Sequence, residues 1–283
     1  GQRIYLSAIR EADAEYLQGN SEIHVVDLKT GAIRALTDRK GPDADPTVSP
    51  NGAFVAYTGY DDKNYTRHLS SLYVMDGDGG AKRLLAGNLA ESPGNLTWAT
   101  DNSGVYFTLG ERGSHVLYFA PLKGELRKVT DGVQTLNGLS VSQTGQVATV
   151  RSSFLEPGHV ATFNLKTPSQ IRKVVDVNAD VLSGVKLGQV EELWFTSKDG
   201  LKVQGWLVKP VDFDPAKKYP LVLWIHGGPW SMYNVGFNWG YQNFAANGYA
   251  VLYTNPRGST GYGQEFVNGI QHAYPGKDYD DLM

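Results

Sequence analysis

Hydrophobic positions follow two different patterns along this chain, and the pattern changes near residue 183. Before it, short runs of apolar residues recur at intervals of roughly 45 residues, the spacing of propeller-type repeats. The best-aligned runs are 23–28, 72–77, 117–122 and 160–165. A second short run follows each of them, at 33–37, 82–85, 126–130 and 171–175. We expect each run to form a short β-strand.

Turn residues separate these strands. Ser49-Pro50-Asn51-Gly52 and Asp101-Asn102-Ser103-Gly104 are two such turns, and a third strand is expected after each. Asn, Asp and Gly supply the positive φ angles that tight hairpins need. Short strands with a turn after each are typical of four-stranded propeller blades. Residues 1–182 are therefore predicted to form a partial β-propeller of about three to four blades.

Residues 183–283 show a different pattern. A Lys198-Asp199-Gly200 turn between two apolar runs predicts a hairpin. The runs 221–225 and 250–254 lack polar alternation, so we expect two parallel strands buried on both faces. Between them, residues 239–247 have helical spacing and end at Gly248, and another helix is expected at 278–283. Strand, helix and strand in this order predict an α/β domain.

Composition narrows the function classes. The chain has 283 residues, 41% of them hydrophobic and 19% charged, as in ordinary folded proteins. A net charge of −3 gives no support for nucleic acid or an anionic membrane as partner. Without cysteine there is no thiolate ligand, and the histidines have no metal-ligand spacing, so no metal or cofactor is expected. The chain starts with Gly1, and its cellular compartment stays open.

His226-Gly227-Gly228-Pro229 follows the first buried strand and is the main candidate for chemistry. Glycines expose backbone N–H groups that can stabilise an oxyanion, as in the His-Gly-Gly-Gly motif of α/β-hydrolases. Pro229 has no N–H, so Gly228 is the first candidate donor and Gly227 the second. A purely architectural turn is the alternative.

Together with Asn255-Pro256-Arg257-Gly258-Ser259-Thr260-Gly261-Tyr262-Gly263, this motif resembles the prolyl oligopeptidase family of serine peptidases. Its dipeptidyl-peptidase and acylaminoacyl-peptidase branches are the most similar. The segment 195–207 also resembles the family's entry into its hydrolase domain. The resemblance implies a β-propeller that restricts access to an α/β-hydrolase with a Ser-Asp-His triad, so that short peptides are the substrates. It assigns residues 183–283 to the N-terminal portion of that hydrolase domain.

The nucleophile of such a hydrolase is missing from this chain. It belongs in Gly-x-Ser-x-Gly, and no serine has glycine at both flanking positions. Ser259 comes nearest, but Arg257 stands where the first glycine belongs. We therefore expect no catalytic residue here, the whole triad after Met283, and no activity of this chain alone. The chain is then a fragment of a serine peptidase.

Three residues are candidates for supporting the substrate pocket. His226 occupies the position where some family members carry an oxyanion-binding tyrosine, which favours the backbone donor at Gly228. Arg257 suits either a substrate carboxylate or, more commonly, the joining of neighbouring loops by hydrogen bonds. Tyr262 lies in the same loop.

Two other functions remain open: a non-catalytic β-propeller that binds a peptide or protein, and an esterase-type α/β-hydrolase. The expected partner is a short peptide substrate. Because the sheet would expose apolar surface, we also expect either a homo-oligomer or association with the missing half of the hydrolase domain.

Overall fold

The computed structural model describes residues 1–16 and 19–283. They form two compact units, each described separately. The first contains Gly1–Leu109 and Leu117–Val129, and the second contains Gly110–Val116 and Thr130–Met283. The domain boundary expected between residues 182 and 183 stays a prediction.

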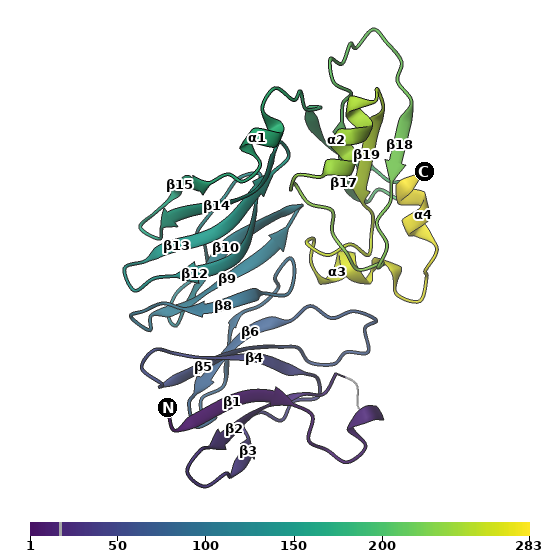
Figure 1. The fold of residues 1–283 in the computed structure, drawn as a ribbon. Helices are drawn as coiled ribbons and strands as arrows, with labels where there is room; N and C mark the ends of the chain where they lie inside the picture. Colours follow the sequence, from purple (N-terminus) through teal and green to yellow (C-terminus); the bar gives the residue numbers. More distant parts are fainter. Residues whose placement is uncertain (17–18) are drawn as a thin grey trace. The chain divides into compact units, whose positions relative to one another are not determined.

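The first unit consists of antiparallel sheets (Figure 1). A three-stranded sheet has the order β1 (Arg3–Ala8), β2 (Glu22–Asp27) and β3 (Ile33–Ala35), and a short 3-10 helix, η1 (Ala14–Tyr16), follows β1. A four-stranded sheet has the order β4 (Asp43–Val48), β5 (Phe54–Gly59), β6 (Ser71–Asp76) and β7 (Arg83–Ala86). The strands β8 (Gly94–Trp98), β9 (Gly104–Glu111), β10 (Ser114–Pro121) and β11 (Arg127–Lys128) come next, and β9 and β10 continue into the second unit. These up-and-down sheets follow the repeat that the sequence predicts.

Turn chemistry explains where these strands end. Gly52 and Asn102 adopt φ angles of 72° and 62°, in the region that glycine and asparagine tolerate best. At the end of β2, the Asp27 carboxylate accepts hydrogen bonds from the N–H groups of Lys29 and Thr30, both 2.9 Å long. Ile23 on β2, Val55 on β5 and Met75 on β6 belong to one buried apolar cluster, so residues of the three-stranded and the four-stranded sheet share it.

The second unit begins with another antiparallel meander: β12 (Thr135–Val141), β13 (Gln146–Ser153), β14 (Glu156–Asn164) and β15 (Thr167–Val175). A short helix, α1 (Ala179–Leu182), follows.

The rest of the second unit is a mixed sheet with the order β16-β17-β19-β18. The predicted hairpin is confirmed as β16 (Val190–Thr196) and β17 (Lys202–Val208). The predicted parallel pair is β18 (Leu221–Trp224) and β19 (Ala250–Asn255). The helix α2 (Trp239–Ala246) packs on this sheet through Tyr241 and Ala245.

Short helices complete the second unit. They are α3 (Gln264–Val267), the 3-10 helix η2 (Asn268–Ile270) and α4 (Lys277–Leu282), of which α4 was predicted. Within the described residues, no helix has the length and apolar character needed to cross a membrane.

One expectation about β18 is wrong. It was predicted to be buried on both faces, but Leu221 is 57% exposed and the following Ile225 is 49% exposed. The reason is its place in the sheet: β18 is the last strand in the order and, within the described part of the chain, pairs only with β19. Trp224 is covered, because it lies edge-on against Tyr241 and Phe244 of α2.

Candidate functional site

The two glycine-rich loops of the sequence follow the carboxyl ends of β18 and β19 in the mixed sheet. β18 and β19 run parallel, with Leu221 opposite Ala250 and Trp224 opposite Tyr253. Both strands therefore end on the same side. Loop 225–229 continues from β18 and loop 256–263 from β19, which is where α/β sheets usually bind ligands.

Gly228 has a backbone that requires glycine. Its φ is 134°, and a Cβ at this position would lie 2.9 Å from the Trp230 nitrogen. Gly227 and Gly228 are both exposed, and among the described residues neither N–H has a hydrogen-bond partner. Unpaired N–H groups on an exposed loop can bind a negatively charged oxygen. Their oxyanion role stays a prediction.

His226 joins the two loops. Its Nε2 lies 3.0 Å from the Ser259 hydroxyl, and its Nδ1 lies 3.1 Å from the Gly227 carbonyl oxygen. With the ring proton on Nδ1, His226 donates to Gly227, and the single Ser259 hydroxyl proton is shared between His226 Nε2 and the Pro256 carbonyl, 2.6 Å away. Burial lowers the pKa of His226, so the imidazole is neutral at pH 7. His226 thus holds the Gly227 carbonyl, which belongs to the same peptide group as the Gly228 N–H, the first candidate oxyanion donor.

Although Ser259 and His226 form a hydroxyl–imidazole pair, Ser259 is poorly placed as a nucleophile. Its relative exposure is 0%, and its hydroxyl is held between Pro256 and His226. A nucleophile has to reach the substrate carbonyl. The pair therefore joins loop 225–229 to loop 256–263, and we call it the His226–Ser259 lock.

Arg257 lies in the most charged part of the site, and carboxylates occupy both sides of its guanidinium. Asp281 of α4 accepts from Nε at 2.8 Å and from Nη2 at 2.7 Å, and it also accepts the Arg257 backbone N–H. Asp199, from the turn between β16 and β17, accepts from Nη1 and Nη2, each at 2.8 Å. Arg257 and Lys277 lower the pKa of Asp199. With these contacts, Arg257 ties two other segments to the β19 loop and has no guanidinium edge left for a substrate.

Tyr262 belongs to a second network beneath the loops. Its hydroxyl donates to Gln204 on β17 at 2.5 Å and accepts from Asn255 at 2.8 Å. The Asn255 side chain also binds the N–H and C=O of Tyr233, at 2.8 and 2.9 Å. Tyr262 therefore ties loop 256–263 to β17 through Gln204.

The second unit also includes the tip of the β9–β10 hairpin, residues 110–116, which lies against these loops. The Arg112 N–H donates to Gly261 at 3.0 Å, and the Gly113 carbonyl accepts from Val235 at 2.8 Å.

The sequence prediction missed several residues of these networks: Asn255, Gln204, Asp199, Asp281 and Arg112. Asn255 stood in the family motif, Gln204 in the segment 195–207, Asp199 in the predicted hairpin turn and Asp281 in the predicted helix, but these signals placed each residue in its element and not with its partner. Among the described residues, no group of His, Asp and Glu is arranged to hold a metal ion.

The chain is similar in sequence to a known family of peptidases and to two dipeptidyl-peptidases. Residues 235–283 match the pattern of the family described as the prolyl oligopeptidase family. Dipeptidyl-peptidase 5 of Schizosaccharomyces pombe is 27% identical over 270 residues, which are 94% of this chain and 39% of that protein. Dipeptidyl-peptidase 5 of Porphyromonas gingivalis is 29% identical over 288 residues, covering 100% of this chain and 42% of that protein.

A solved structure shows the same fold. The acylaminoacyl peptidase of Pyrococcus horikoshii superposes with a TM-score of 0.82 at 24% identity, covering 100% of this chain and 43% of that one. The chain thus spans less than half the length of the relatives that it matches.

Proposed function

This chain is related to the prolyl oligopeptidase family, as its motifs predicted, and we propose that it is part of a serine peptidase that hydrolyses short peptides. The observation that carries the proposal is the pair of exposed N–H groups at Gly227 and Gly228, which have no partner among residues 1–16 and 19–283. They lie where β18 ends, in a loop that His226 and Ser259 hold.

In the proposed reaction, these N–H groups bind the oxygen of a peptide carbonyl as it becomes negatively charged. Donors that are already in position stabilise this charge at no cost of reorganisation. Gly228 contributes first and Gly227 second, while the His226–Ser259 lock keeps the loop in place.

The attack itself is assigned to a Ser-Asp-His triad outside this chain. The sequence offers no Gly-x-Ser-x-Gly, and Ser259 is buried. The chain spans 39% and 42% of its dipeptidyl-peptidase relatives, which leaves room for a triad in the remainder of such a protein. We therefore propose that the chain alone is inactive.

The proposed substrates are short peptides from which a dipeptide or an acylated amino acid is released. The names of the relatives, dipeptidyl-peptidase 5 and acylaminoacyl peptidase, support this class. We further propose that the antiparallel sheets are blades of a β-propeller and that the hydrolase portion starts near residue 183.

Gly228→Ala in the full-length protein tests the oxyanion proposal. A Cβ here is strained at φ 134° and meets Trp230, so the loop has to move and the N–H turns away from the substrate. Loss of one oxyanion donor lowers kcat by about a hundred- to a thousandfold, and we expect KM to change much less.

Gly31→Ala is the matched control. Gly31 also has a positive φ, 73°, but a Cβ there meets nothing within 4 Å. Its φ lies close to the left-handed region, so alanine costs less strain there than at Gly228, and it lies far along the chain from the loop. Steady-state kinetics in which the two variants lose activity equally, or in which Gly228→Ala keeps full kcat, would contradict the role of Gly228.

A further inference from the structure

Asn255, the last residue of β19, binds the segment 230–235 that follows loop 225–229. Asn255 is fully buried. Its Oδ1 accepts the Tyr233 N–H at 2.8 Å, and its Nδ2 donates to the Tyr233 carbonyl at 2.9 Å. Residues 231–234 belong to no helix or strand. One side chain therefore supplies the pair of hydrogen bonds that a neighbouring strand usually gives to an extended segment.

The partners of the Asn255 amide fix its orientation. Tyr233 needs an acceptor for its N–H and a donor for its carbonyl, so Oδ1 and Nδ2 cannot exchange places. The other Nδ2 proton goes to the Tyr262 hydroxyl at 2.8 Å, and Tyr262 donates to Gln204 at 2.5 Å. We call Asn255, Tyr262 and Gln204 the Asn255 network. Gln204 lies opposite Asn255 in the β17–β19 pairing, so the network starts and ends on paired strands of the sheet.

Tyr233 connects this network to the candidate oxyanion donors. Its ring lies edge-on against the His226 ring, with 4.9 Å between the ring centres and 78° between the planes. His226 holds the Gly227 carbonyl, which shares a peptide group with the Gly228 N–H. The Tyr233 ring also lies edge-on against Tyr253 of β19, at 5.5 Å. A shift of the Tyr233 backbone therefore moves a ring that packs against His226.

We propose that Asn255 is a positioning residue for loop 225–229, and that it acts on the Gly228 N–H through Tyr233 and His226. This inference rests on the proposed oxyanion role of that loop. Asn255 itself is buried and does not touch the substrate. An oxyanion donor works only in the right place, since a misplacement of about 1 Å costs roughly a hundredfold in rate.

Other hydrogen bonds of segment 230–235 limit the expected effect. The Ser231 carbonyl accepts the Thr260 N–H at 2.9 Å, and the Val235 N–H donates to the Gly113 carbonyl at 2.8 Å. Both bonds join backbone atoms, so a substitution at Asn255 removes neither of them. Loss of the Asn255 side chain should therefore shift the segment rather than unfold it.

Labelling of the full-length protein with a fluorophosphonate separates positioning from folding. In this reaction the oxygen of the nucleophilic serine bonds to phosphorus, its proton goes to the general base, and fluoride leaves. Negative charge builds up on the phosphoryl oxygen, so the rate constant of labelling depends on the oxyanion donors. The final amount of label counts the correctly folded sites. A residue with a purely structural role changes only that final amount.

Asn255→Leu removes all three hydrogen bonds of this side chain at a similar volume. We expect the rate constant of labelling and kcat to fall about ten- to a hundredfold, while KM for a short peptide changes little. Tyr262→Phe removes only the hydroxyl that accepts from Asn255 and should lower both by about two- to tenfold, the range of one hydrogen bond. This milder variant decides the question if Asn255→Leu does not fold.

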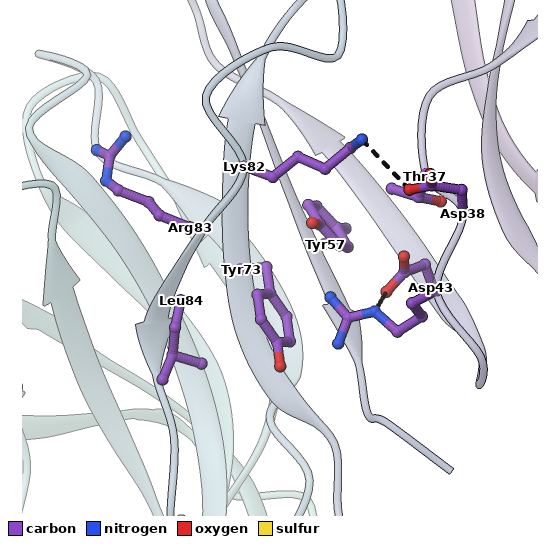
Figure 2. A pocket seen from close by; sticks show the side chains of 9 residues that line it. Thr37, Asp38, Asp43, Tyr57, Tyr73, Lys82, Arg83 and Leu84 are labelled. Atoms are coloured by element: carbon purple, nitrogen blue, oxygen red, sulfur yellow. Dashed lines mark ion pairs between the residues drawn. The ribbon is translucent and has the colours of Figure 1, made fainter.

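Tyr57→Phe is the matched control for Tyr262→Phe. It removes the same hydroxyl group from a fully buried tyrosine of the first unit. There Tyr57 lies beside Tyr73 in the wall of a cavity of ≈ 220 Å³ (Figure 2). Tyr57 is not a member of the Asn255 network, so the rate constant of labelling and kcat should stay at their wild-type values.

The expected result is slower labelling with a full final amount of label, weakest in Tyr262→Phe, stronger in Asn255→Leu and strongest in Gly228→Ala. Wild-type rate constants in Asn255→Leu and Tyr262→Phe, or a reduced final amount at an unchanged rate constant, overturn the positioning role alone if Gly228→Ala is slow. A wild-type rate constant in Gly228→Ala contradicts the oxyanion role of the loop and this inference with it.

Discussion

Arg257 shows, at the scale of single residues, why a charged side chain in a glycine-rich loop need not bind substrate. Asp281 and Asp199 take up its guanidinium, and the Asp281 side chain is 0% exposed. Removing one member of a buried ion pair leaves the other charge without compensation, which is strongly destabilising. Arg257 therefore matters first for the shape of the loop.

Asp281→Ala tests this role. We expect the free energy of unfolding of the second unit to fall by about 3–5 kcal/mol, because Arg257 stays buried without its main partner. Lys277→Gln is the control: Lys277 is 65% exposed and lies 3.2 Å from Asp199, so its removal should cost less than about 1 kcal/mol. Urea unfolding measures both, and equal effects would contradict the buried pair.

The sequence predicted the loops of the site but not these partners. Asp281 and Asp199 lie 24 and 58 positions from Arg257, and Ser259 lies 33 positions from His226. Turn and helix signals are local, so they place each residue in its own element only. The pairing depends on how α4 and the β16–β17 turn pack, which no local pattern encodes.

Among the elements, strands with clear apolar runs were predicted well, and two strands that open a sheet, β4 and β8, were not. β4 reads Asp43-Ala44-Asp45-Pro46-Thr47-Val48, and β8 begins with Gly94-Asn95. Residues of these types are rare in strands, so propensity argued against both. Their neighbours in the sheet hold them in place, with β4 paired to β5 and β8 to β9.

The tip of the β9–β10 hairpin provides a test at this scale. Gly113 has a φ of 79°, and a Cβ there would lie 2.5 Å from the buried Trp206 ring. Gly132 also has a positive φ, 101°, but has nothing within 4 Å of such a Cβ. The pair therefore separates steric overlap from backbone strain.

We expect Gly113→Ala to destabilise the second unit by about 1–3 kcal/mol more than Gly132→Ala, because Trp206 is stacked on Tyr253 and cannot give way. Chemical unfolding followed by tryptophan fluorescence measures the difference. Equal stabilities would mean that the hairpin tip does not pack on Trp206.

On the scale of the whole molecule, the exposed end of the mixed sheet has a consequence. Leu221 and Ile225 are largely exposed at β18, which among the described strands pairs on one side only, and Trp239 is 51% exposed. Open strand edges with apolar side chains favour association between chains. We therefore expect this chain to self-associate as its concentration rises.

Leu221→Lys should reduce that association, since a charge at a strand edge opposes pairing with another chain. Val177→Lys is the control, because Val177 is 72% exposed but lies outside the mixed sheet. Sedimentation at several concentrations measures the effect. A wild-type chain that stays monomeric, or equal effects of both variants, would contradict this prediction.

The central claim is that this chain carries the oxyanion side of a peptidase site and that the nucleophile comes from elsewhere in the full-length protein. Labelling with a fluorophosphonate, which reacts with activated serines, tests it most directly. We predict no labelling of this chain and labelling of the full-length protein at a serine outside residues 1–283, together with hydrolysis of short peptides. Labelling of Ser259, or of any other serine in this chain, would contradict the claim.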